Sequence, residues 1–332
     1  MSAIVIDGDL IHYEKLGRGR PVILVHGWLG SWRYWIPLMQ QLHLKYSVYT
    51  LDLFGFGDSA KNAERYGIEA QVAMLSDFME QLGIPKAALI GHSLGAMVVT
   101  EFALRHPDRA ARVMLASAPL FDPGNLDERV PPGQQILLTQ RDRYSLAPNL
   151  AEEEARAQAE AKAESTAARI EQSDRARLIE RARLFAQRRD SNPLREHLLG
   201  KKLVDVLEKC FKRSEAEYEK IRPDAEKTDE KVISTTIDGF EPGEMLDKIR
   251  RISAPLLVVH GTEDPLLPVP TEDVWHYLSI EKDDIFVPIP LPGVRHFPML
   301  EYEPFPRLTT DFLETVDLTK LELRERWRRR SR

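Results

Sequence analysis

Short apolar runs alternate with longer amphipathic segments through the first third of the chain and again after residue 250. The apolar runs are rich in β-branched residues and predict buried strands, while apolar positions at helical spacing predict helices between them. The strands are expected at PVILVHG, YSVYTLDL, AALIG, RVMLASAP, APLLVVHG and DIFVPIP, and the helices at residues 32–42, 67–82, 94–106, 270–278 and 304–316. A hairpin with its turn at Asp7-Gly8-Asp9 precedes them. The alternation predicts an α/β fold in which helices flank a mostly parallel sheet.

The segment from residue 120 to residue 244 has a different pattern, with no stretch that predicts a strand. Residues 151–190 contain nine acidic and nine basic side chains among many alanines, which predicts a solvated helical stretch. An apolar stripe at helical spacing follows, formed by Leu199, Leu203, Val206, Leu207, Cys210 and Phe211. We therefore expect an inserted all-helical cap over residues 120–244, lying across the carboxyl edge of the sheet, where ligands of open α/β sheets bind. The core domain then comprises residues 1–119 and 245–320, and residues 321–332 form a basic tail.

Charge and composition narrow the classes of partner. The formal net charge is −6, from 46 Lys and Arg against 52 Asp and Glu, and predicts no nucleic-acid partner. In the tail, six arginines surround Trp327, a combination suited to weak contact with an anionic membrane surface, although a solvated tail is the simpler interpretation. No apolar run approaches the roughly 20 residues that cross a bilayer, and no signal peptide is evident, so a cytoplasmic location is expected. The composition leaves the oligomeric state open.

Metal and nucleotide sites find little support in the sequence. The single cysteine, Cys210, excludes an internal disulfide and a cysteine-built metal site. The stretch AEEEARAQAEAKAE has carboxylates but lacks histidine at ligand spacing. No lysine follows Gly55 and Gly57 as it would in a phosphate-binding loop, so these glycines are expected to shape a turn that Asp52 and Ser59 stabilise.

The stretch ALIGHSLGAM places Ser93 between Gly91 and Gly95, directly after a predicted strand and before a predicted helix. This is the context of a nucleophile elbow, in which small neighbours allow a strained serine to stand at a sharp turn. A serine at a helix start is also an ordinary N-cap, so the motif alone does not decide between the two interpretations.

A serine nucleophile needs a base and a group that orients the base. His296 lies in the loop after the last predicted strand, and Asp264 follows the strand APLLVVHG. The chain order Ser93, Asp264, His296 is that of the nucleophile-elbow fold. Glu263 is the rival acid, and His26 is the histidine that is hardest to dismiss as a rival base, although an orienting hydrogen bond suits it better.

Transition-state stabilisation requires backbone donors near the serine. Leu94, just after the nucleophile, is expected to supply one amide, and Trp28, in the loop after VILVHG, the other. The side chains of Trp28, Trp35 and Phe121 are candidates for the lining of an apolar substrate cleft, although each residue type is more often part of a core.

Five motifs in order, VILVHGWLGS, LDLFGFGDS, IGHSLGA, VVHGTEDPLLP and GVRHFPMLEYEPF, give the chain a resemblance to the α/β-hydrolase family over about residues 10–119 and 250–315. The resemblance implies an eight-stranded sheet, a cap inserted after the sixth strand and no cofactor. It supports Ser93, Asp264 and His296 as the triad, with Trp28 and Leu94 as oxyanion donors. Serine at position 93 argues against the dehalogenases and epoxide hydrolases of this fold, which have aspartate there.

The expected function is that of a serine hydrolase cleaving a hydrophobic carboxylic ester through an acyl-enzyme on Ser93. Two alternatives stay open. The same triad could cleave a carbon–carbon bond next to a ketone, a thioester or an amide. The chain could instead be a ligand-binding or scaffold protein on a hydrolase fold, because function resides in the site and not in the fold.

Overall fold

The computed structural model describes residues 2–122, 124, 126–129, 192–282, 284–318 and 321. The chain divides into two compact units, one formed by Met1–Phe121 with Pro193–Arg332 and the other by Asp122–Asn192. The helical stretch expected over residues 151–190 lies outside the described residues, as does the basic tail except for residue 321. Within the second unit, the described residues include helix α4 (Leu126–Arg129).

The first unit is built on an eight-stranded sheet. Its strands are β1 (Ser2–Ile6), β2 (Asp9–Leu16), β3 (Arg20–Val25), β4 (Tyr46–Leu51), β5 (Ala87–His92), β6 (Ala110–Ala116), β7 (Leu256–Gly261) and β8 (Phe286–Leu291). Their order is β1-β2-β4-β3-β5-β6-β7-β8. The pairs β1–β2 and β2–β4 are antiparallel and the other five are parallel. The structure therefore confirms the predicted α/β fold with a mostly parallel eight-stranded sheet.

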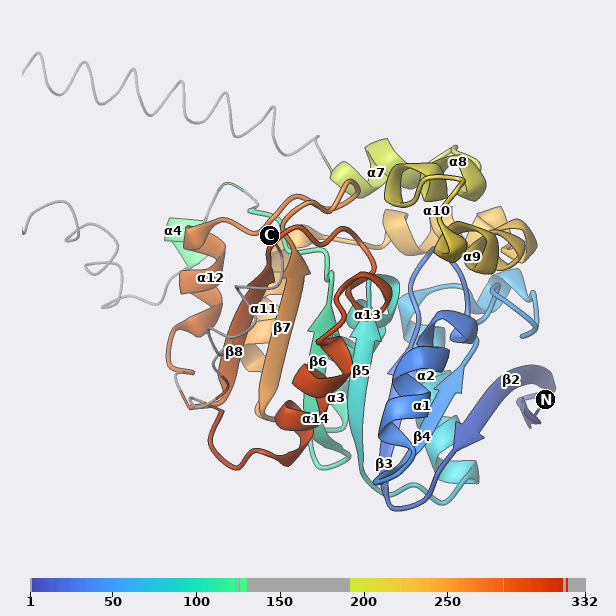
Figure 1. Cartoon of the computed structure of the whole chain (residues 1–332), viewed down its shortest axis with the longest axis horizontal. Helices are drawn as coiled ribbons and strands as arrows, with labels where there is room; N and C mark the ends of the chain where they lie inside the picture. Colours follow the sequence, from blue (N-terminus) through green and yellow to red (C-terminus); the bar gives the residue numbers. More distant parts are fainter. Residues whose placement is uncertain are drawn as a thin grey trace, which may run out of the picture. The chain divides into compact units, whose positions relative to one another are not determined.

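Helices cover both faces of this sheet (Figure 1). Helix α1 (Ile36–Leu42) contacts α14 (Phe305–Glu314) on one face, and α3 (Leu94–Arg105) contacts α2 (Ile68–Gln81) and α11 (Pro242–Arg251) on the other. Because both faces are covered, every residue of β4, β5 and β7 is buried, as continuous apolar strands of parallel sheets require.

Four further helices lie above the carboxyl edge of the strands in Figure 1: α7 (Pro193–Leu198), α8 (Leu203–Cys210), α9 (Ala216–Lys227) and α10 (Glu230–Asp238). These helices fall within the cap predicted over residues 120–244, and by contacts they belong to the same compact unit as the sheet. Helix α8 buries Leu203, Val206, Leu207 and Cys210, which form most of the predicted apolar stripe.

Shorter elements complete the first unit: η1 (Trp32–Trp35), η2 (Ala63–Arg65), α12 (Glu272–Ser279) and α13 (Pro298–Glu301). None of the helices in the described ranges combines the length and the apolarity that a membrane span needs.

Candidate active site

Ser93 stands at the turn between β5 and α3, with φ 56° and ψ −115°. A residue other than glycine in this left-handed region is strained by about 1–3 kcal/mol, so the surrounding packing must enforce the conformation. The Ser93 amide donates to the carbonyl of Ala116 at the end of β6 (3.0 Å). The turn is thus held to the neighbouring strand, as a nucleophile elbow requires.

The two motif glycines of the elbow are needed because the backbone packs too closely for a side chain. A Cβ on Gly91 would lie 2.3 Å from the carbonyl oxygen of Gly95, and a Cβ on Gly95 would lie 2.2 Å from that of Val25 in β3. A third glycine was not anticipated. A Cβ on Gly27, in the loop after β3, would lie 2.5 Å from the Cβ of Ser93. A larger residue at Gly27 would press on Ser93 itself, and one at Gly91 or Gly95 would force apart the backbone that holds the turn.

The structure brings the three predicted triad residues together. His296 Nε2 lies 3.1 Å from Ser93 Oγ, and His296 Nδ1 lies 2.8 Å from Asp264 Oδ2. Ser93 comes from the end of β5, Asp264 from the loop after β7 and His296 from the loop after β8. These distances allow His296 to accept the serine proton while the carboxylate holds the opposite ring nitrogen.

Asp264 is itself fixed by the backbone. Its Oδ1 atom accepts hydrogen bonds from the amides of Leu266 (2.9 Å) and Leu267 (3.0 Å), and its side chain is fully buried. Burial by itself raises the pKa of a carboxyl group, but the charge and hydrogen bond of His296 bring the pKa of Asp264 below its ordinary value. The group therefore stays ionised beside the imidazole. Glu263, the rival acid, is exposed.

The two residues expected to supply oxyanion donors are Leu94 and Trp28. Leu94 is the first residue of α3, so its N–H has no acceptor within the helix and is available to an anion. Trp28 lies in the loop after β3, next to Gly27, whose Cα is close to Ser93. His26 of the same loop receives the Leu53 amide on Nε2 (3.0 Å) and binds the Gly27 carbonyl through Nδ1 (2.9 Å). It orients the loop and lies outside the triad.

The three aromatic residues expected to line a substrate cleft are nearly inaccessible in this conformation. Trp28 is 1% exposed and donates its indole N–H to Thr236 in α10 (2.9 Å). Phe121 packs edge-on against Phe240, with ring centroids 6.0 Å apart. Trp35 is fully buried in η1. Ser93 is also 0% exposed, so its hydroxyl is closed off from solvent in this conformation.

Helix α9 is attached to the loop after β3 by buried polar contacts that the sequence did not reveal. Asp224, which is 2% exposed, accepts from Ser31 Oγ (2.6 Å) and from Arg33 Nη1 (2.7 Å). Arg33 also pairs with Asp58, which Lys227 contacts as well. These contacts connect the helices above the sheet edge to the loop that carries the Trp28 amide.

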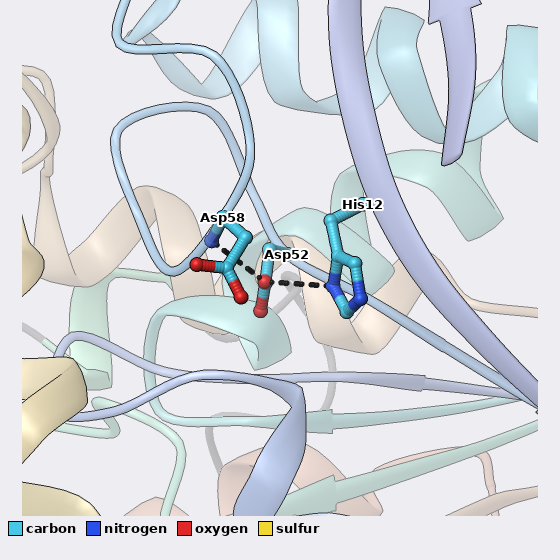
Figure 2. Close-up of side chains that lie close together, drawn as sticks. All are labelled: His12, Asp52 and Asp58. Carbon is cyan, nitrogen blue, oxygen red and sulfur yellow. Dashed lines mark hydrogen bonds and ion pairs between the residues drawn. The ribbon is translucent and has the colours of Figure 1, made fainter. Parts of the chain in front are cut away.

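A cluster of His12, Asp52 and Asp58 offers potential metal ligands, with atoms within 4.8 Å of one another. Figure 2 shows Asp52 between the other two, accepting from His12 Nδ1 (3.0 Å) and from the Asp58 amide (3.1 Å). Asp52 also accepts from the Trp32 amide (2.9 Å), and the Asp58 carboxylate is paired with Arg33 and Lys227. The carboxylates are therefore already neutralised by protein groups, and the cluster suits a hydrogen-bonding hub better than a cation site.

The hub supports the predicted turn. Ser59 Oγ donates to the carbonyl of Asp52 (2.7 Å), and Gly55 and Gly57 have φ of 89° and 48°. Burial raises the pKa of Asp52, but the hydrogen bond from His12, the electrostatic interaction with His26 and the hydrogen bonds from the amides of Trp32 and Asp58 lower it overall. The pKa of His12 is raised because Asp52 outweighs the effect of its burial. The pair is thus mutually stabilised in its charged form.

Comparison with known proteins agrees with this architecture. The family model described as alpha/beta hydrolase fold matches residues 20–275, so the chain belongs to the α/β-hydrolase family. It is 35% identical to bifunctional epoxide hydrolase 2 of Rattus norvegicus over 122 residues, which are 35% of this chain and 22% of the relative. It is 34% identical to the (lyso)-N-acylphosphatidylethanolamine lipase of Homo sapiens over 119 residues, or 34% of this chain and 35% of the relative.

These matches thus span about a third or less of the length of those two relatives. Among solved structures, a bromoperoxidase from Bacillus anthracis superimposes with a TM-score of 0.63 and 21% identity, over 92% of this chain and 96% of that one. This likeness shows the common fold.

Proposed function

We propose that the protein is a serine hydrolase that cleaves hydrophobic carboxylic esters through an acyl-enzyme on Ser93. The observation that carries the proposal is the continuous contact from Ser93 Oγ to His296 Nε2 (3.1 Å) and from His296 Nδ1 to Asp264 Oδ2 (2.8 Å), with the serine at a strained elbow. Membership of a hydrolase family and similarity to a lipase support the same class of reaction.

In the first half of the reaction, Ser93 Oγ attacks the ester carbonyl carbon while His296 Nε2 removes its proton. Asp264 stabilises the imidazolium that forms, and the amides of Trp28 and Leu94 donate to the carbonyl oxygen as it becomes an oxyanion. Collapse of the tetrahedral intermediate breaks the bond to the alcohol oxygen, which takes the proton from His296. Water then attacks the acyl-serine by the same route, releasing the acid and restoring the hydroxyl.

The serine also bears on the epoxide hydrolases among the relatives. Attack of a serine hydroxyl on an epoxide would form an ether, and a triad of this kind has no route to hydrolyse an ether. Attack on an ester forms an acyl-serine, which water can cleave. The nucleophile therefore favours acyl transfer over epoxide opening.

The hydrophobic character of the substrate is inferred from the aromatic residues near the site. Trp28 contacts Thr236 and Phe121 contacts Phe240, so displacement of these contacts would expose aromatic surface on both residues. Trp35 is fully buried and its ring packs against that of Tyr34, with centroids 5.2 Å apart, so its proposed role is to support this aromatic wall. Apolar walls with few polar groups are typical of small-molecule sites.

Hydrolysis of p-nitrophenyl acyl esters by the wild type, Ser93→Ala and Ser117→Ala tests the proposal. Ser117 is a matched control because it too is buried, has a positive φ (45°) and directly follows the neighbouring strand β6. Wild type and Ser117→Ala are expected to release p-nitrophenol, and Ser93→Ala to lose about 10⁴-fold or more. Activity that survives in Ser93→Ala would remove Ser93 from the mechanism. Turnover of a vinylogous diketone without turnover of any ester would favour carbon–carbon cleavage.

A further inference from the structure

A buried chain of hydrogen bonds lies next to the triad. It includes the side chains of Tyr34 and His92, which have no role in the proposed reaction. The Gly27 amide donates to Tyr34 Oη (2.6 Å), Tyr34 Oη lies 2.8 Å from His92 Nδ1, and His92 Nε2 lies 2.7 Å from the carbonyl oxygen of His296. Tyr34 is 4% exposed and His92 is 0% exposed. The chain joins the loop after β3, the nucleophile elbow and the loop after β8.

The direction of each hydrogen bond is fixed by the chemistry of its partners. A carbonyl oxygen can only accept, so His92 Nε2 carries a proton. Burial, together with the nearby His296, holds the pKa of His92 well below its ordinary value, so the ring is neutral and Nδ1 has a free lone pair. The Tyr34 hydroxyl therefore donates to Nδ1 and accepts the Gly27 N–H. Neither ring nitrogen of His92 has an alternative role.

The contact on His296 involves its backbone, while its side chain is occupied by the triad. His92 directly precedes Ser93, and the rings of His92 and His296 have centroids 4.8 Å apart. A rotation of the peptide after His296 would carry the imidazole away from Ser93 Oγ or from Asp264 Oδ2. Misplacement of a catalytic group by about 1 Å can cost on the order of 100-fold in rate.

We propose that His92, oriented by Tyr34, is a positioning residue that fixes the backbone of His296 and so keeps its imidazole aligned between Asp264 and Ser93. This inference rests on the proposed function, because it concerns the same triad. The hydrogen bond of His92 goes to the backbone of His296 and not to the atoms that react. It acts through His296.

The test compares His92→Leu with the conservative His92→Gln, whose amide N–H can reach the position of Nε2. In His92→Leu we expect kcat for a p-nitrophenyl ester to fall roughly 10- to 100-fold with KM changed less than about twofold, since alignment and not binding is lost. His92→Gln should recover kcat to within about fivefold of wild type. A wild-type kcat in His92→Leu, or equal losses in both variants, would overturn the proposal.

Tyr34→Phe removes one oxygen and guards against the case in which His92→Leu fails to fold. It should lower kcat by about tenfold, because the ring of His92 loses the group that orients it. Tyr66→Phe is the matched control, since Tyr66 is equally buried and its hydroxyl binds Asp229 (2.7 Å), away from the triad. Equal effects of the two tyrosine variants on kcat would show a purely structural role for Tyr34.

A spectroscopic measurement separates this proposal from the proposed function. The proton that His296 Nδ1 shares with Asp264 should give a low-field ¹H NMR signal in the wild type and in His92→Gln, and the signal should broaden or vanish in His92→Leu. This readout needs no substrate. If the wild type neither hydrolyses esters nor reacts with a fluorophosphonate, the proposed function fails, and the NMR comparison still decides the positioning role. An unchanged signal in folded His92→Leu, or no signal in the wild type, would refute it.

Discussion

Asp264→Asn is the substitution whose effect the structure specifies most closely. Asp264 Oδ1 accepts two backbone amides, from Leu266 and Leu267, so in the variant the amide oxygen must take this position. The amide nitrogen then faces His296 Nδ1, where it can only donate. Nδ1 becomes an acceptor, and the imidazole proton moves to Nε2, the ring nitrogen that faces the Ser93 hydroxyl. In that tautomer the histidine cannot receive the serine proton.

The size of the effect follows from this tautomer change. Loss of the correct tautomer in a serine triad costs about 10⁴-fold in kcat, which corresponds to about 5.4 kcal/mol in the barrier. The side chain of Asp264 is fully buried and aspartate and asparagine have nearly the same shape, so packing around the loop after β7 should be preserved. We therefore expect inactivity without a loss of fold.

The assay is the rate of p-nitrophenol release at saturating ester, with circular dichroism to confirm folding. Glu263→Gln is the matched control, because it makes the same chemical change one residue earlier, on an exposed side chain. It should retain activity within about twofold. Asp264→Asn within tenfold of wild type, or a larger loss in Glu263→Gln than in Asp264→Asn, would refute the assignment of the orienting acid.

Two further predictions concern stability. Asp224→Ala leaves the Ser31 hydroxyl and part of the Arg33 guanidinium without an acceptor, while Arg33 is 33% exposed and keeps its pair with Asp58. The free energy of unfolding, measured by urea titration, should therefore fall by roughly 2 kcal/mol. A decrease below about 0.5 kcal/mol would contradict the attachment of α9 by these contacts. His12, whose pKa is raised in the folded state by Asp52, contributes stability that is present below its unfolded pKa and lost as pH rises through the folded value. The stability difference between wild type and His12→Gln should therefore shrink from about pH 6 to about pH 8, and a constant or growing difference would contradict the charged pair.

The sheet and the elbow could be predicted from the sequence because local sequence patterns determine them. Strands that helices cover on both faces are buried along their whole length and need mainly apolar sequences, as in β5 and β7. The glycines around Ser93 predict a turn, and the close approach of Gly95 to Val25 explains why no larger residue fits. The order of the three triad residues along the chain then placed them at one edge of the sheet.

The supporting contacts could not be predicted, because they join residues far apart in the chain. His92 binds a carbonyl 204 positions away, and Ser31 binds Asp224 across 193 positions. No periodicity signals such pairs. The sequence placed His92 beside the nucleophile, but nothing in the run SWRYW indicated that Tyr34 would orient it. Likewise, the stripe on α8 predicted that this helix packs on something, but not that its neighbours would belong to the unit of the sheet.

The central claim is that Ser93 forms a covalent acyl intermediate, and mass spectrometry of the rapidly quenched enzyme tests it most directly. After brief exposure to a p-nitrophenyl ester and acid quenching, the wild-type protein should gain the mass of one acyl group. Peptide mapping should assign that group to Ser93, and Ser93→Ala should gain none while Ser117→Ala behaves as wild type. An acyl group found on another residue, or steady hydrolysis that proceeds unchanged in Ser93→Ala, would contradict the account.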